Sequence, residues 1–335
     1  MIEQLGGFLY VVLGTIFVAL FGIGFGLGVL GVDRKLTAHM QARIGPPLRQ
    51  PFIDIRKLLL KENIIPENAI SWLFNAAPVF ALAASVTILL YLPIGGLPPV
   101  LGVYGDIILI MYLLTVPALA MVTGGFASGS PYATVGAQRE MITMMAYELP
   151  LATVFIALAW RLARAGVQDP FSLASLTSTP IWSVAGPLGI IGALILLIVL
   201  IFVTPGELSR VPFDTPEAET ELAGGLMVEY SGKNLAMFYL AQGVKSVAMA
   251  SVIVALFLPW GLSEFVPGIP ALGILLDFLW YIVKVLAVLF VSVSLIRVAM
   301  ARFRISQVVT MYWIYLGGLG ILGLTLLFLD SLGGV

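Results

Sequence analysis

The segment AGPLGIIGALILLIVLIFVT, residues 185–204, indicates a transmembrane helix because it runs for 20 residues without a charged side chain. About 20 apolar residues are needed to cross the hydrocarbon core of a bilayer as an α-helix. Regular alternation of polar and apolar residues is absent, which argues against a β-barrel. We therefore predict an all-α polytopic membrane protein with about eight transmembrane helices. The other predicted spans cover 5–31, 70–92, 105–126, 138–160, 235–259, 275–296 and 309–329.

The composition agrees with a single transmembrane domain over residues 1–335. The chain is 60% hydrophobic and 10% charged, whereas soluble proteins carry about 25% charged residues. A net charge of −1 provides no basic field for nucleic acid. With no cysteine and one histidine, this chain is not expected to hold an iron–sulfur cluster, a zinc site or a disulfide.

Lysine and arginine set the predicted orientation, since they concentrate on the cytoplasmic side of membrane proteins. The loops after the first, third, fifth and seventh spans, with their flanks, hold thirteen of these residues, and the opposite loops hold only Arg161 and Arg164. Both termini are therefore predicted to lie outside. The thirteen residues are Arg34, Lys35, Arg43, Arg49, Arg56, Lys57, Lys61, Arg139, Arg210, Lys233, Arg297, Arg302 and Arg304.

The first cytoplasmic loop, predicted at 33–69, contains the segment QPFIDIRKLLLKE at 50–62. On a helix, its apolar residues share one face and its charged residues share another. The segment is too short and too charged to span, so we predict an amphipathic helix in the membrane interface. The apolar face holds Phe52, Ile55, Leu58 and Leu59, and the polar face holds Asp54, Lys57 and Lys61.

The third cytoplasmic loop, predicted at 205–234, is densely acidic. Pro212 and Pro216 break regular helix around Phe213 and Asp214. The mixture of prolines, apolar residues and carboxylates favours a contact surface for a soluble partner, with a proton-accepting cluster beneath that surface. The alternative is a solvated acidic connector. If Glu217 and Glu221 lie one helical turn apart, their repulsion should raise at least one pKa. The six carboxylates are Glu207, Asp214, Glu217, Glu219, Glu221 and Glu229.

Four ionisable residues fall inside or at the mouth of predicted spans, where a charge is costly. Glu140 and Glu148 lie in the fourth span, Lys245 in the sixth and Lys284 in the seventh. Counted along their helices, Glu148, Lys245 and Lys284 should lie near one level of the membrane. Such a set can exchange a proton when a nearby charge changes. The alternative is a buried ion pair that only fixes helix packing.

Three segments resemble one family. They are GPPLRQPFIDIRKLLLKE at 45–62, SPYATVGAQREMITMMAYELPL at 130–151 and SRVPFDTPEAETELAGGLMVEYSG at 209–232. They resemble the signatures of the complex I membrane component that docks the quinone-reducing arm, the 1 or H subunit of NADH:quinone oxidoreductase. In the second segment, Tyr147-Glu148 stands in the place of the family's Tyr-Glu.

One departure resembles a second branch of the family, found in membrane-bound energy-converting [NiFe] hydrogenases and related ferredoxin-dependent sulfur-reducing complexes. Here Gly45-Pro46-Pro47 runs almost directly into Gln50, where complex I members carry Gly-Pro-Asn and a longer insert. The missing insert helps to form the quinone-tunnel entrance in complex I. The shortening therefore implies that no quinone pocket remains.

The resemblance implies a non-catalytic anchor and coupling subunit in the plasma membrane of a prokaryote. It implies docking, through loops 33–69 and 205–234, of a hydrogenase-like large subunit and a small iron–sulfur subunit that oxidise ferredoxin. Antiporter-like membrane subunits would move protons or sodium, and the [NiFe] centre and the clusters would lie in the soluble partners, with no cofactor in this chain. The alternatives are the quinone- or phenazine-site subunit of a complex I-like oxidoreductase, or an autonomous cation/proton antiporter.

Two sets of residues carry these expectations. The ion pathway would use Glu140, Glu148, Glu207, Asp214, Glu217, Glu219, Glu221, Glu229, Lys245 and Lys284. Partner docking would use Arg43, Gly45, Pro46, Pro47, Gln50, Asp54, Lys57, Arg210, Pro212 and Phe213.

Overall fold

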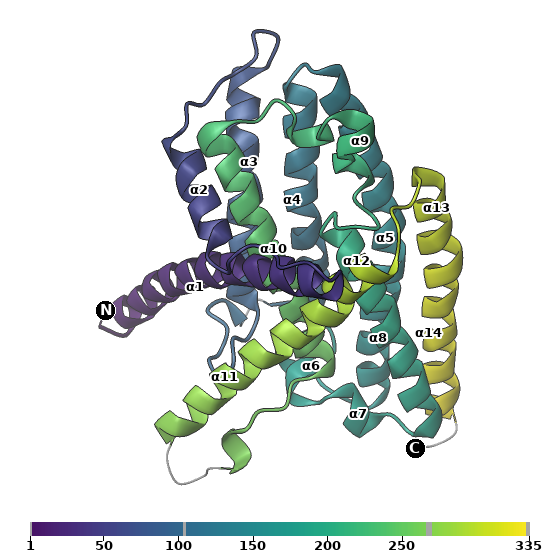
Figure 1. The fold of residues 1–335 in the computed structure, drawn as a ribbon. Helices are drawn as coiled ribbons and strands as arrows, with labels where there is room; N and C mark the ends of the chain where they lie inside the picture. Colours follow the sequence, from purple (N-terminus) through teal and green to yellow (C-terminus); the bar gives the residue numbers. More distant parts are fainter. Residues whose placement is uncertain (1, 103–104, 266–269, 333–335) are drawn as a thin grey trace.

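The computed structural model describes residues 2–102, 105–265 and 270–332, and these residues form the helical bundle in Figure 1. Eight of its helices, in the described ranges, are long and apolar enough to cross a membrane, which confirms the predicted fold class. The first five are α1 (Ile2–Met40), α3 (Ser71–Tyr91), α4 (Ile107–Ala127), α5 (Pro131–Arg164) and α8 (Pro187–Glu207). The others are α10 (Gly232–Phe257), α11 (Pro270–Leu289) continuing through η5 (Phe290–Leu295) and α12 (Ile296–Ala299), and α13 (Ile305–Thr310) continuing through η6 (Met311–Leu316) into α14 (Gly317–Leu332).

The connections gather at two ends of the bundle. At the end that we call the loop end, Ile64 N–H donates to the Ser231 hydroxyl and Ile70 N–H donates to the Ala127 carbonyl, so three loops meet there. At the far end, α6 (Leu173–Ser178) and α7 (Ile181–Val184) cover the bundle. Figure 1 shows the loop end at the top and the far end at the bottom.

Helix α1 is much longer than a membrane requires. Its 39 residues correspond to about 58 Å at 1.5 Å per residue, against a hydrocarbon thickness of about 30 Å. Figure 1 shows α1 steeply inclined to α3, α4 and α5. The helix also continues to Met40, so residues 33–40, which we predicted as loop, are helical.

Helix α2 (Gln50–Leu60) confirms the amphipathic helix predicted after the first span. It buries Pro51 and Ile55 against the bundle and leaves Phe52 and Leu60 exposed. It packs between α1 and α10, so its buried face belongs to this chain and its exposed face is free for lipid or protein.

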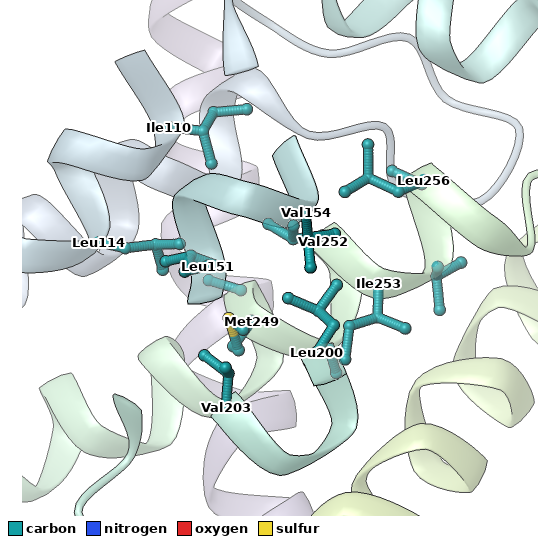
Figure 2. Close-up of a cluster of buried hydrophobic side chains, with 14 of the residues drawn as sticks. Ile110, Leu114, Leu151, Val154, Leu200, Val203, Met249, Val252, Ile253 and Leu256 are labelled. Carbon is teal, nitrogen blue, oxygen red and sulfur yellow. The ribbon is translucent and has the colours of Figure 1, made fainter. Parts of the chain in front are cut away.

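Helix α10 is enclosed by the other spans, and an apolar layer surrounds its far half, from Met249 to Leu256 (Figure 2). This layer is nearly inaccessible and joins α10 to α4, α5 and α8. On α8 and α10, the buried Glu207 and Lys245 lie on the loop side of the layer. On α5, Glu140 lies on the loop side, and Arg161 lies on the far side, where it pairs with Asp330 at 3.0 Å. The apolar layer consists of Ile110, Leu114, Leu151, Val154, Leu200, Val203, Met249, Val252, Ile253 and Leu256.

The acidic loop is folded and does not trail into solvent. It forms η2 (Thr215–Glu217), α9 (Glu219–Leu222) and η3 (Gly225–Met227), and both η2 and η3 pack on α5. The contact is close because Gly136 has no side chain. A Cβ atom there would lie 2.9 Å from the Pro216 carbonyl oxygen and 2.8 Å from the Leu226 nitrogen.

Candidate functional site: a buried charge cluster beneath the acidic loop

An ion pair lies in the core of the bundle. Lys245 Nζ of α10 lies 2.7 Å from Glu207 Oε1 at the end of α8, and the two side chains are 3% and 0% exposed. Removing two charges from water is costly, and their mutual attraction offsets the cost only when the geometry is close. Glu207 was expected in the loop. It is instead the last residue of the span, which places it within reach of Lys245.

Helix α5 adds two polar groups to this pair. The Glu140 carboxylate is fully buried, accepts a hydrogen bond from the Ser209 hydroxyl at 3.3 Å, and has Lys245 as its main opposite charge. The buried Tyr147 hydroxyl interacts with the Glu207 carboxylate. We call Glu140, Tyr147, Glu207, Ser209 and Lys245 the buried charge cluster. Two carboxylates and one amine give it one negative charge when all are ionised, so it has the composition to share a proton.

Two members of this cluster were not predicted as site residues. Tyr147 belongs to the Tyr-Glu pair of the second motif, and this pair could have identified it as a site residue. No pattern pointed to Ser209, which occupies the first turn after α8. Its contact with Glu140 joins residues 69 positions apart, and such a contact depends on the fold.

Glu148 lies outside the cluster, on the surface of α5. Its side chain is half-buried, and Met145 and Leu149 beside it are exposed. Within the described ranges its carboxylate makes no hydrogen bond and no ion pair. Eight residues rotate a helix by about 80° beyond two full turns, which explains why Glu140 faces the core while Glu148 reaches the membrane-facing surface.

Lys284 is not level with Lys245, and that expectation is wrong. The Lys284 ammonium donates to the carbonyls of Leu258 and Trp260, just beyond the far end of α10. Leu258 is 13 residues beyond Lys245, or about 20 Å along a helix axis. The depth of Lys284 depends on the tilt of α11 beside α10 (Figure 1), which the sequence does not determine.

The loop carboxylates divide by partner. Asp214 pairs with Arg302 through two contacts of 2.6 and 2.9 Å, and Glu221 pairs with Arg139 at 2.5 Å. Glu219 is exposed and Glu229 is half-buried. These pairs connect the loop to α5 and to the segment before α13.

Glu217 and Glu221 are not on one helix, because Ala218 between them is extended. The expected mutual repulsion is therefore not the main cause of their pKa values. Burial raises the pKa of Glu217 to about 7, with Arg210 opposing the shift. The hydrogen bond and charge of Arg139 hold the pKa of Glu221 below its usual range.

This difference predicts a titration near neutral pH. The folded loop holds the Glu217 proton more tightly than the unfolded chain does, so the stability of the loop should fall as pH rises from about 4.5 through about 7. We expect a protonated-carboxyl infrared band that disappears with a midpoint near pH 7 and is absent in Glu217→Gln. Glu221→Gln should leave the band unchanged. A band that persists in Glu217→Gln would assign the titration to another carboxyl group.

The predicted docking residues divide into exposed and buried groups. Arg43, Gly45, Pro47 and Lys57 are exposed, while Pro46 and Arg210 are half-buried. Gln50 and Asp54 hydrogen-bond to each other, and Asp54 also pairs with Arg34. Pro212 and Phe213 are buried, and the Phe213 ring packs 4.9 Å from that of Tyr312. The expectation that these two residues contact a soluble partner directly is therefore wrong, because they are buried and support the loop from inside.

A pocket of about 330 Å³ lies between α1, α2 and α10. Leu27 and Leu30 of α1 and Tyr239 and Gln242 of α10 line it, and Arg210 lines it from the acidic loop. The volume falls in the range of small-molecule sites. The expectation that the short first loop leaves no quinone pocket stays a prediction.

Two π-helical turns accompany the site. Spans seven and eight are interrupted by η5 (Phe290–Leu295) and η6 (Met311–Leu316), and such turns often occur at functional positions. Ser294 in η5 donates to Asp33 of α1 at 2.6 Å. Tyr312 in η6 donates to the Phe202 carbonyl, five residues before Glu207. The apolar sequences of both segments carry no signal for these turns.

Comparisons with known proteins agree with this architecture. The NADH dehydrogenase family model matches residues 12–328. The H subunit of NADH-quinone oxidoreductase from Brevibacillus brevis is 30% identical over 314 residues, which cover 92% of this chain and 89% of the relative. The corresponding protein of Anoxybacillus flavithermus is 33% identical over 307 residues, covering 87% of each chain.

A solved structure is also similar. A chain of the membrane-bound sulfane sulfur reductase, an archaeal respiratory membrane complex, aligns with a TM-score of 0.82 and 28% identity. The alignment covers 95% of this chain and 99% of that one. Together with the family model and the two bacterial relatives, it shows that this chain belongs to the NADH dehydrogenase family, the family of the H-type membrane subunits of respiratory complexes.

Proposed function

We propose that this chain is the membrane anchor and coupling subunit of a respiratory complex. It docks a soluble redox arm on its loop end and converts electron transfer there into ion movement by neighbouring membrane subunits. The observation that carries this proposal is the buried Lys245–Glu207 pair, at 2.7 Å, directly beneath a folded acidic loop. A loop that only connected two spans would not require an ionisable core below it.

The proposed relay begins in the loop and ends on the membrane-facing surface of α5. A charge change at the docked arm alters the protonation of the loop carboxylates. Glu140 and Ser209 join the loop to the Glu207–Lys245 pair. The apolar layer lies between this cluster and the far end, so the response leaves sideways, through the Glu148 carboxylate. A membrane subunit that covers Glu148 would supply the polar partner which that carboxylate needs at membrane depth.

The proposed partners follow from the loop end. We place it on the cytoplasmic side of a prokaryotic plasma membrane, because lysine and arginine concentrate there. Its soluble partners would be a hydrogenase-like large subunit and a small iron–sulfur subunit that accept electrons from ferredoxin. The shortened Gly45-Pro46-Pro47 loop and the similarity to a sulfane sulfur reductase chain support this branch of the family.

The pocket between α1, α2 and α10 favours a second candidate function. A volume of about 330 Å³ can hold the head group of a quinone or a phenazine. In that case, this chain would line the acceptor site of a complex I-like oxidoreductase. Assaying the purified complex for quinone or phenazine reduction against hydrogen evolution and sulfur reduction separates the two functions.

Glu148→Gln tests the proposed relay. The substitution keeps the size and hydrogen-bonding capacity of the side chain but removes its titration. We expect a complex that assembles and transfers electrons at the parent rate but builds little or no ion gradient. Glu148→Asp should retain part of the gradient, because the acid remains while its reach shortens by one methylene.

Electron transfer and gradient formation are to be measured together in sealed vesicles. Asp169→Asn, the same chemical change at an exposed far-end position, is the matched control and should behave as the parent. An undiminished gradient per electron in Glu148→Gln would remove Glu148 from the relay.

A further inference from the structure

The far end of α10 is held by side chains of two other elements. An α-helix leaves its last carbonyl groups without backbone partners, and inside a bilayer such groups are costly to leave unpaired. At the end of α10, Trp182 Nε1 of α7 donates to the Phe257 carbonyl at 2.7 Å. The Lys284 ammonium of α11 donates to the Leu258 carbonyl at 2.7 Å and to the Trp260 carbonyl at 2.9 Å. The carbonyl groups at and just after the end of α10 therefore accept hydrogen bonds from an indole N–H and an ammonium group.

The same face of α11 binds the amide groups that come next. Asp277 lies seven residues, about two helical turns, before Lys284. Its carboxylate accepts the N–H groups of Leu262 at 2.5 Å and Ser263 at 2.9 Å. The cation binds carbonyls and the anion binds amides, so each charge meets the backbone group of complementary polarity.

The approach of Asp277 to this segment is close. A Cβ atom added to Gly261 would lie 2.5 Å from Asp277 Oδ1, and one added to Gly96 would lie 3.0 Å from the Asp277 side chain. The segment after α10 and the segment after α3 therefore both pack closely against the Asp277 side chain. Side chains at either glycine would push α11 away.

We propose that Lys284 and Asp277 form a clamp that fixes the far end of α10, and that Lys284 is a positioning residue for Lys245 and does not carry protons. Since a helix is stiff along its axis, fixing Leu258 sets the height of Lys245 opposite Glu207. The effect on coupling rests on the function proposed above. The effect on the stability of the bundle does not.

Two substitutions separate a clamp from a proton carrier. Lys284→Met keeps most of the length but donates no hydrogen bond. Lys284→Arg donates to carbonyls and stays protonated, so it can hold the clamp but cannot release a proton. Asp169→Asn, which removes a charge from an exposed position at the same far end of the bundle, is the control. Each variant is prepared as the whole complex, and its melting temperature and its gradient per electron are measured.

We expect Lys284→Met to melt roughly 5 °C lower and to lose gradient per electron, while Lys284→Arg and Asp169→Asn match the parent in both. A parent-like melting temperature in Lys284→Met would overturn the clamp. An Arg variant that melts like the parent yet builds no gradient would overturn the positioning role and assign Lys284 to proton transfer. If the complex builds no gradient at all, the proposed function fails, and the melting temperatures still test the clamp.

Discussion

Replacing Lys245 with methionine should abolish gradient formation and destabilise the chain by about 3–5 kcal/mol. The Glu207 carboxylate, 0% exposed, would lose the amine that lies 2.7 Å from one of its oxygens. Glu140 would lose its main opposite charge at the same time. Two buried carboxylates without a counter-ion would then have to bind protons, and the cluster could no longer exchange one. Thermal unfolding of the complex and gradient formation in vesicles measure the two losses.

A second variant separates the structural cost of this pair from its function. Lys245→Met combined with Glu207→Gln removes both charges, so much of the lost stability should return. The gradient should not return, because the titratable pair is gone. A double variant that regained both stability and gradient would show that the pair only holds α8 and α10 together.

Gly136→Ala should detach the acidic loop from α5. The new methyl group would lie 2.8 Å from the Leu226 nitrogen and 2.9 Å from the Pro216 oxygen. These are backbone atoms that cannot rotate away, so η2 and η3 must shift. Overpacking of this kind costs about 1–3 kcal/mol. We expect faster amide hydrogen exchange over residues 215–227 and loss of the soluble subunits during purification.

Gly28→Ala is the control for this variant. Gly28 is also helical, but an added Cβ atom there has no other atom within 4 Å, so alanine should be neutral or stabilise α1 by up to ~1 kcal/mol. If Gly136→Ala shows unchanged amide hydrogen exchange and retains all soluble subunits, the packing of the loop on α5 is not required for docking.

The spans could be predicted well from the sequence because an apolar run of bilayer length satisfies its backbone hydrogen bonds in lipid by forming an α-helix. The pairing of charges was harder to predict, since a position along one helix does not determine which neighbour it faces. Lys245 and Glu207 are 38 residues apart, and the Arg302–Asp214 pair joins residues 88 apart. Lys284 was placed wrongly for the same reason. Its depth depends on the inclination of α11, which packing determines.

The apolar layer around α10 also determines where the membrane voltage acts. A voltage drops mainly across the low-dielectric part of its path, and in this core that part is the layer from Leu114 to Leu256. Glu207, the last residue of α8, lies on the loop side of it. Moving one charge across the whole membrane potential costs about 2.3 kcal/mol per 100 mV. A proton that reaches Glu207 from the loop end has crossed only a small part of that potential. Under the proposed function, the work against the potential would then fall to the neighbouring subunits that carry the ion across.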